Sequence, residues 1–224
     1  MNNRFALFDW DNTVRKGFTL FTWIDFLCNN SIISNDLQCE MNSIKIMYNK
    51  KRITHDQYAE LACSLFAKKL AGISTTVLTQ ALEKYIIHDK SYLISDIGSV
   101  FDILYKKRID IIILSGAPEL VVQQYQEAFH IKQIYAFKED EIDGVYSGKV
   151  RYNYGFNKQQ TVDILCKEYK ANPLIAFGDS ESDVPMLIKA RNSFCVGKAL
   201  SLPNLKYINQ SGISAEILDY IWRI

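Results

Sequence analysis

Several features typical of membrane-spanning, secreted and nucleic-acid-binding proteins are missing from this sequence. Its longest uninterrupted apolar runs, such as Ile111–Leu114, are only a few residues and too short to span a bilayer. The 26 Lys and Arg residues nearly balance the 25 Asp and Glu residues, so the net charge favours neither nucleic acid nor a membrane as partner. The five cysteines include no C-x-x-C pair, and they therefore indicate neither a zinc site nor a disulfide framework.

A secretion signal is also missing from the start of the chain. Arg4 leads directly into a short apolar segment, and no cleavable apolar region precedes it. Together with the cysteine usage, this predicts a reducing, cytoplasmic location and mostly buried structural thiols. With 224 residues and no Pro/Gly/Ser-rich linker or internal repeat, the chain is long enough for a core domain with a modest insertion.

The first part of the chain is dominated by helical patterns. Residues 5–8 form an apolar strand, and from about residue 19 to 107 the apolar side chains recur almost throughout at helical spacing. Thr54 and Gln57 form a capping box that predicts a helix start, and Gly72 marks the end of that helix. We therefore predict an all-helical insertion over residues 14–108, within a core formed by residues 1–13 and 109–224.

From residue 109 onward, strands and helices alternate. The predicted strands are 109–114, 134–137, 174–177 and 194–196, and the predicted helices are 119–129, 157–169 and one that begins near Pro185. Asp143-Gly144 and Ser147-Gly148, which alternate with apolar residues, predict a small hairpin before Tyr152. This alternation predicts an α/β fold with a doubly wound parallel sheet.

Polar groups follow three of the predicted strands. Asp9 and Asp11 come after the first strand, Ser115 after the second, and Asp179 and Asp183 after a third. Taken alone, each group has a simpler interpretation, as an Asp-rich turn, a strand-to-helix turn or a helix cap. Because the carboxyl ends of parallel strands meet at one edge of a sheet, we expect these groups to converge in one cleft.

Four ordered motifs resemble those of the haloacid dehalogenase-like phosphatases. They are Asp9-Trp10-Asp11-Asn12-Thr13, Ser115-Gly116, Lys158, and Gly178-Asp179-Ser180-Glu181-Ser182-Asp183. The long gap of 106 residues from Asp9 to Ser115, and the shorter one of 43 from Ser115 to Lys158, resemble the branch with a helical cap after the first motif, typified by phosphoserine phosphatase. The resemblance implies a Rossmann-like catalytic core and a phosphatase that acts on a small organic phosphate monoester.

The resemblance assigns the covalent chemistry to two carboxylates. Asp9 would attack the phosphorus and become an aspartyl-phosphate, and Asp11 would protonate the leaving oxygen and then activate water. An Asp acts in this way near neutral pH only if its surroundings raise its pKa, which a neighbouring carboxylate does.

The resemblance assigns binding roles to the other motif residues. Ser115 and Gly116 would hold the phosphoryl oxygens, and Lys158 would supply a fixed positive charge. Asp183 would bind a metal-bound water or orient Lys158. Oxygen ligands of this kind suit Mg²⁺. The predicted metal residues are Asp9, Asp11 (through its backbone carbonyl), Asp179 and Asp183.

The substrate is less well defined by the sequence. Phosphoserine phosphatases carry a glutamate nine residues after the nucleophile, and Phe18 stands at that position here, which counts against phosphoserine. Arg15, Lys16 and Arg52 are candidates for contacts to the leaving group, although solvent exposure explains them equally well. A phosphotransferase with the same intermediate and a non-catalytic binding module remain alternatives, but retention of every motif residue argues against the second. The sequence predicts no oligomeric state.

Overall fold

The computed structural model describes residues 3–197 and 200–224, and the chain divides into two compact units. Unit 1 comprises Met1–Phe18, Lys90–Ala136 and Tyr154–Ile224, of which residues 1–2 and 198–199 lie outside the described part; unit 2 comprises Thr19–Asp89 and Phe137–Asn153. These units do not coincide with the predicted boundaries at 13/14 and 108/109. Residues 90–108 group with unit 1, and residues 137–153 group with unit 2.

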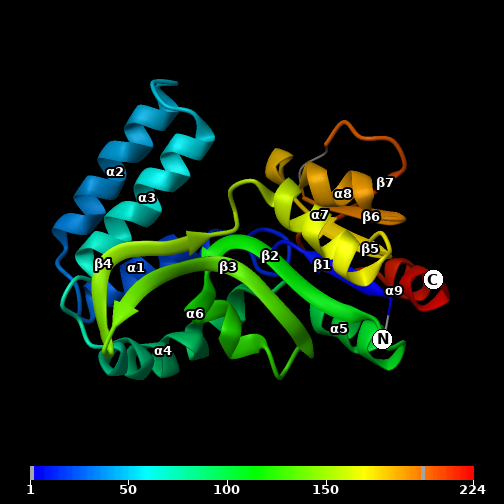
Figure 1. Ribbon diagram of the computed structural model, residues 1–224, viewed down its shortest axis with the longest axis horizontal. Helices are drawn as coiled ribbons and strands as arrows, with labels where there is room; N and C mark the ends of the chain where they lie inside the picture. Colours follow the sequence, from blue (N-terminus) through cyan, green and yellow to red (C-terminus); the bar gives the residue numbers. More distant parts are fainter. Residues whose placement is uncertain (1–2, 198–199) are drawn as a thin grey trace. The chain divides into compact units, whose positions relative to one another are not determined.

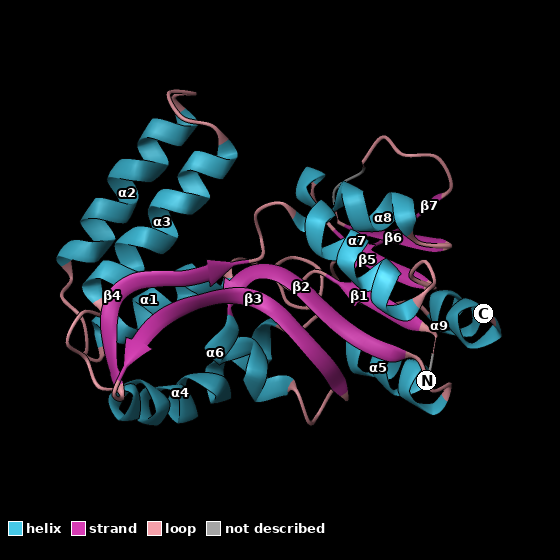
Figure 2. Cartoon of the chain, viewed as in Figure 1, coloured by secondary structure: helices cyan, strands magenta, loops and turns pink. Residues whose placement is uncertain are grey.

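The secondary structure follows the predicted alternation (Figures 1 and 2). The strands are β1 (Phe5–Phe8), β2 (Asp110–Pro118), β3 (Ile131–Ile142), β4 (Val145–Asn153), β5 (Ile175–Gly178), β6 (Asn192–Val196) and β7 (Leu205–Ile208). The α-helices are α1 (Thr19–Asn29), α2 (Asp36–Asn49), α3 (His55–Lys69), α4 (Thr75–Asp89), α5 (Ile97–Lys106), α6 (Glu119–Val122), α7 (Lys158–Tyr169), α8 (Val184–Lys189) and α9 (Ala215–Arg223). Short 3₁₀ turns lie at η1 (Lys90–Tyr92), η2 (Gln123–Tyr125) and η3 (Glu181–Asp183). No helix in the described part of the chain combines the length and apolar character that a membrane crossing requires.

The sheet has the strand order β4-β3-β2-β1-β5-β6-β7. Strands β2, β1, β5, β6 and β7 pair in parallel, which confirms the predicted doubly wound α/β fold. Strands β3 and β4 form an antiparallel hairpin with its turn at Asp143-Gly144. This confirms the predicted hairpin, in which Ser147 and Gly148 lie within β4.

The core of unit 1 is built on both faces of the central strands. Phe5 and Leu7 of β1 point to the face covered by α7 and α8, in a cluster that includes Leu165. Phe8 points to the other face, where its ring lies 4.8 Å from Phe101 of α5. Because helix α5 packs on this face, residues 90–108 belong to unit 1 even though their helical pattern resembles that of the preceding segment.

Unit 2 combines the helices α1–α4 with the β3–β4 hairpin. Trp23 of α1 packs against Tyr85 of α4, with ring centroids 4.8 Å apart. The backbone N–H of Gly72 donates to the carbonyl of Tyr146, at 3.0 Å, and so links the end of α3 to β4. At Gly148, which has φ +84°, a Cβ atom would lie 2.9 Å from the Cβ of Ala71. These contacts between segments far apart in the sequence bring the hairpin into the helical unit.

Three elements differ from the sequence-based expectation. The helix predicted over 119–129 ends at Val122 and continues as η2 only to Tyr125, although Tyr125 and Phe129 are both buried. Strand β7 and helix α9 were not predicted; the helix is tied to β6 by a hydrogen bond from the Tyr220 hydroxyl to Asn192, at 2.7 Å. Three of the five cysteines are buried, Cys39 is exposed and Cys166 is half-buried; all five are free thiols.

Candidate active site

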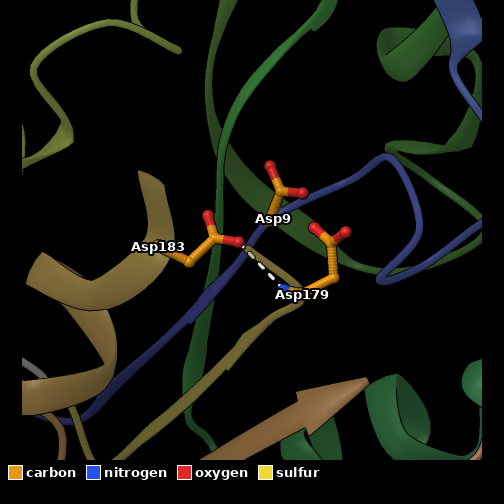
Figure 3. Close-up of side chains that lie close together, drawn as sticks. All are labelled: Asp9, Asp179 and Asp183. Atoms are coloured by element: carbon orange, nitrogen blue, oxygen red, sulfur yellow. Dashed lines mark hydrogen bonds between the residues drawn. The ribbon is translucent and has the colours of Figure 1, made fainter. Parts of the chain in front are cut away.

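Two carboxylates are positioned by the paired ends of β1 and β5. These strands are parallel neighbours with Phe8 opposite Phe177, and the backbone N–H of Asp9 donates to the Phe177 carbonyl at 3.0 Å. The pairing therefore continues one residue beyond β1 and places Asp9 next to the segment that begins with Asp179. Figure 3 shows the two side chains projecting into the same space, together with Asp183.

The loop after Asp9 is held by a compact network of backbone hydrogen bonds. The carbonyl of Trp10 accepts from the N–H groups of Thr13 at 3.2 Å, Val14 at 2.8 Å and Arg15 at 3.2 Å. Asn12 has φ 59°, a left-handed conformation that Asn tolerates well. Its side-chain oxygen accepts from the N–H of Gly17 at 3.0 Å. The half-buried Asp11 is thus carried on an ordered turn.

Lys158 joins two of the carboxylates. It is the first residue of α7 and is only 3% exposed, so it is not the solvated lysine that an isolated helix start suggests. Its Nζ donates to Asp9 Oδ1 at 2.7 Å and to Asp183 Oδ1 at 2.6 Å. A buried ammonium group between two carboxylates fixes the position of both oxygens.

Asp183 uses its other oxygen to hold the loop after β5. Oδ2 accepts from the backbone N–H of Asp179 at 2.9 Å, from the N–H of Ser180 at 3.0 Å and from the Ser180 hydroxyl at 3.2 Å. The capping interpretation of this segment is therefore correct alongside the contact with Lys158. A Cβ at Gly178 would overlap the Asp183 side chain, with Cγ at 2.7 Å, so only glycine fits at this position.

Ser115 and Gly116 lie within the last part of β2, which extends to Pro118, and not in a turn after the strand. The Ser115 side chain is buried, and its Oγ accepts from the N–H of Ala117 at 3.2 Å. A hydrogen bond from Ser115 also lowers the pKa of Asp9, although other contributions outweigh it.

Burial and charge repulsion dominate the electrostatics of the carboxylates. Burial has the largest effect on Asp9 and raises its pKa. The charge of Lys158 lowers this pKa and that of Asp183 raises it, and the net value is about 6. Burial, followed by the charges of Asp9 and Asp183, raises the pKa of Asp179 to about 8. Burial alone would lower the pKa of Lys158, but the charges of Asp183 and Asp9 raise it above its ordinary value, so the ammonium form persists.

The other predicted site residues lie outside the group formed by Lys158 and its neighbouring carboxylates. The Asp11 side chain is not part of the group formed by Asp9, Asp179 and Asp183 within the described residues. Arg15 is fully buried, with its guanidinium 4.6 Å from the centre of the Tyr92 ring, so the solvent-exposed alternative is wrong for this residue. Lys16 is exposed, as is Arg52 in the turn between α2 and α3.

Comparison with known proteins identifies the family. A family model described as haloacid dehalogenase-like hydrolase matches residues 4–191. The chain belongs to this family. The match ends before β6, so β6, β7 and α9 lie beyond it. A search of curated proteins finds no match.

Solved structures share the haloacid dehalogenase-like fold at low sequence identity. A Bordetella pertussis Tohama I protein of unknown function has 19% identity and a TM-score of 0.75, with 94% of this chain and 100% of that chain covered. A phospho-aspartyl intermediate analogue of phosphoserine phosphatase has 18% identity and a TM-score of 0.69, with 98% and 99% covered. Cytosolic 5'-nucleotidase IIIB bound to cytidine has 14% identity and a TM-score of 0.65, with 99% and 86% covered. At these identities, the likeness is one of fold.

The carboxylates of this family member form a suitable donor set for a divalent cation. One oxygen from each of Asp9, Asp179 and Asp183 lies within 4.8 Å of the others. With all three carboxylates ionised, the single ammonium of Lys158 leaves excess negative charge. Burial raises the pKa of Asp9 and Asp179 most, and repulsion between the carboxylates raises both further. A hard cation with a preference for oxygen ligands would balance that charge.

Sequence reasoning assigned no role to two residues that shape this site. Ser180 supplies both a hydroxyl and a backbone N–H to Asp183, and Gly178 leaves the space that the Asp183 side chain fills. The Ser-x-x-Asp spacing of a capping box and a glycine at a strand end are the signals that point to them.

Proposed function

We propose that this haloacid dehalogenase-like hydrolase is a magnesium-dependent phosphatase that hydrolyses a small organic phosphate monoester. The observation that carries this proposal is the buried ammonium of Lys158 at 2.7 Å from Asp9 and 2.6 Å from Asp183, beside the carboxylate of Asp179. Phosphoryl transfer demands a positioned nucleophile and positive charge around the phosphoryl group, and this arrangement supplies both.

In the first step, a carboxylate oxygen of Asp9 attacks phosphorus while the bond to the leaving alkoxide breaks. Asp11 donates a proton to that alkoxide, and an aspartyl-phosphate remains on Asp9. With a pKa of about 6, Asp9 is mostly ionised near neutral pH, as a nucleophile requires. Lys158 stabilises the negative charge on the transferring group, and Ser115 and Gly116 bind its oxygens.

In the second step, Asp11 accepts a proton from water, the water oxygen bonds to phosphorus, and the bond to Asp9 breaks. Inorganic phosphate leaves, and both carboxyl groups return to their starting states. Asp183 acts through its contacts, because one oxygen orients Lys158 while the other holds the loop that carries Asp179.

Magnesium is the cofactor that fits these ligands. The residues that would hold it are Asp9, the backbone carbonyl of Asp11, Asp179 and, through water, Asp183. When bound, it would neutralise negative charge on the phosphoryl oxygens. We further propose that unit 1 is the catalytic core and that the helical part of unit 2 is the cap that selects the substrate.

The test is release of inorganic phosphate from a panel of phosphate monoesters by the wild type and by Asp9→Asn. We expect the wild type to need Mg²⁺ and the variant to lose activity by roughly a thousandfold or more, with an unchanged circular dichroism spectrum. Near wild-type turnover of Asp9→Asn would contradict the aspartyl-phosphate mechanism. Adding a small alcohol and measuring its phosphorylated product distinguishes the phosphatase from a phosphotransferase.

A further inference from the structure

The α2–α3 hairpin of unit 2 ends in a surface that we call the basic tip, residues 45–52. Its four cations, all exposed, are Lys45, Lys50, Lys51 and Arg52. No acidic residue occurs anywhere from position 41 to position 55. Figure 1 shows the turn between α2 and α3 at the end of the hairpin, beyond the helices and strands that pack within this unit.

Charge is unevenly distributed along this hairpin: four cations gather in the basic tip, and the next carboxylates along the chain, Asp56 and Glu60, lie in the first turns of α3. Near the start of α2, Asp36 and Glu40 form ion pairs with Lys69 at the end of α3, at 2.9 and 2.7 Å. None of the four cations of the basic tip forms an ion pair with a residue in the ranges 3–197 and 200–224. We predicted no membrane partner from the near balance of charge over the whole chain. A whole-chain total does not reveal a local group of cations such as the basic tip.

The basic tip also exposes aliphatic side chains. Leu37 and Met41 form the buried side of α2, whereas Ile46 is 52% exposed and Met47 is 39% exposed. Ile46 and Lys50 are one helical turn apart and therefore lie on the same outward side of the helix. A surface that pairs cations with exposed aliphatic groups is typical of peripheral membrane contacts.

We propose that the basic tip docks on a lipid surface rich in anionic headgroups. A solvated helix end accounts for one lysine near the C-terminus of α2, where it offsets the helix dipole, but not for three more cations beside exposed Ile46 and Met47. RNA fits this surface less well. The nearby rings of Tyr48 and Tyr58 are stacked on each other, 5.0 Å apart and at 14°, and aliphatic groups gain nothing from phosphates. The inference does not depend on the proposed phosphatase activity.

Co-sedimentation with lipid vesicles tests this proposal. We expect the full chain to bind phosphatidylcholine vesicles that contain about 30% phosphatidylserine, and not phosphatidylcholine alone. Each cation near such a surface contributes about fivefold in binding, so replacing Lys50, Lys51 and Arg52 by Glu should weaken it by about a hundredfold or more. Raising NaCl from about 50 to about 500 mM should release the wild type. Replacing both Ile46 and Met47 by Ser should also weaken vesicle binding, and this loss should be present even at low salt, because it removes apolar contact and no charge.

A matched control removes the same charge elsewhere. Lys106, Lys167 and Lys170 are exposed lysines of unit 1, and replacing all three by Glu changes the net charge equally. This control should retain vesicle binding to within a few-fold. Equal losses in the two triple variants, or no wild-type binding to the anionic vesicles at low salt, would overturn the proposal. The proposal would also be overturned if the wild type bound a fluorescent single-stranded RNA through the basic tip but did not bind vesicles. Circular dichroism and thermal unfolding verify that every variant is folded.

Discussion

Replacing Lys158 by methionine is the most informative single perturbation of this site. Methionine keeps much of the aliphatic volume but removes an ammonium group that is 3% exposed and bonded to Asp9 and Asp183 at 2.7 and 2.6 Å. Removal of one partner from a buried ion pair leaves an uncompensated charge and typically costs about 3–5 kcal/mol. For a chain of this size, 1 kcal/mol corresponds to about 2–4 °C in Tm, so we expect a fall of about 10 °C.

The loss should depend on pH because the carboxylates can take up protons. Folded-state pKa values of about 6 for Asp9 and about 8 for Asp179 lie above the ordinary value of 3.8. A group with a raised pKa contributes stability that is present at low pH and is lost as the pH rises through the folded pKa, here between about pH 4 and 8. Without Lys158, which lowers both pKa values, proton uptake becomes still more favourable. The variant should therefore lose more stability at about pH 8 than at about pH 5.

Thermal unfolding of the metal-free protein at both pH values measures this difference. Lys69→Met is the matched control, because Lys69 also contacts two carboxylates, Asp36 and Glu40, but at the surface. Surface ion pairs typically contribute about 1 kcal/mol or less, so this variant should barely change Tm at either pH. A similar Tm loss for Lys158→Met at both pH values, or one no larger than that of the control, would refute this account of the site.

Three further predictions concern the metal, Gly178 and the selection of the substrate. Mg²⁺ should raise Tm more at about pH 8 than at about pH 5, because it competes with protons for the carboxylates. Excess chelator should abolish the activity and Ca²⁺ should suppress the activity, whereas unchanged activity in chelator would exclude the metal site. Gly178→Ala should lower both Tm, measured by calorimetry, and kcat, measured from initial rates, because the added Cβ displaces Asp183. Gly98→Ala in α5 is the control: the nearest atom to its added Cβ is 3.7 Å away, so kcat should be unchanged and Tm unchanged or higher. Lys16→Ala or Arg52→Ala should lower kcat/KM for the preferred substrate with little change for a small aryl phosphate, and equal losses on both substrates would show that neither side chain selects the substrate.

Local sequence patterns were sufficient to identify most elements of this protein. The capping box of Thr54 and Gln57 is present at the start of α3, and residues 110–114 of the strand predicted over 109–114 lie in β2 of the sheet. Residues that follow parallel strands must meet at one edge of the sheet, so the approach of Asp9 and Asp179 was also predictable from the order of the motifs. Periodicity and capping act over a few residues, which is why the sequence alone is enough for them.

Other contacts between distant segments were decided only by the tertiary structure. Lys158 meets Asp9 across 149 residues of sequence. The resemblance implied a role for Lys158, but its local sequence does not distinguish it from a solvated lysine at a helix start, and only the structure shows its burial and its second contact, with Asp183. The burial of Arg15 against Tyr92, like the grouping of α5 with unit 1 and of the hairpin with unit 2, depends on which surfaces pack together. Packing joins surfaces from separate segments, whereas a pattern along the chain records only which side of each segment is apolar.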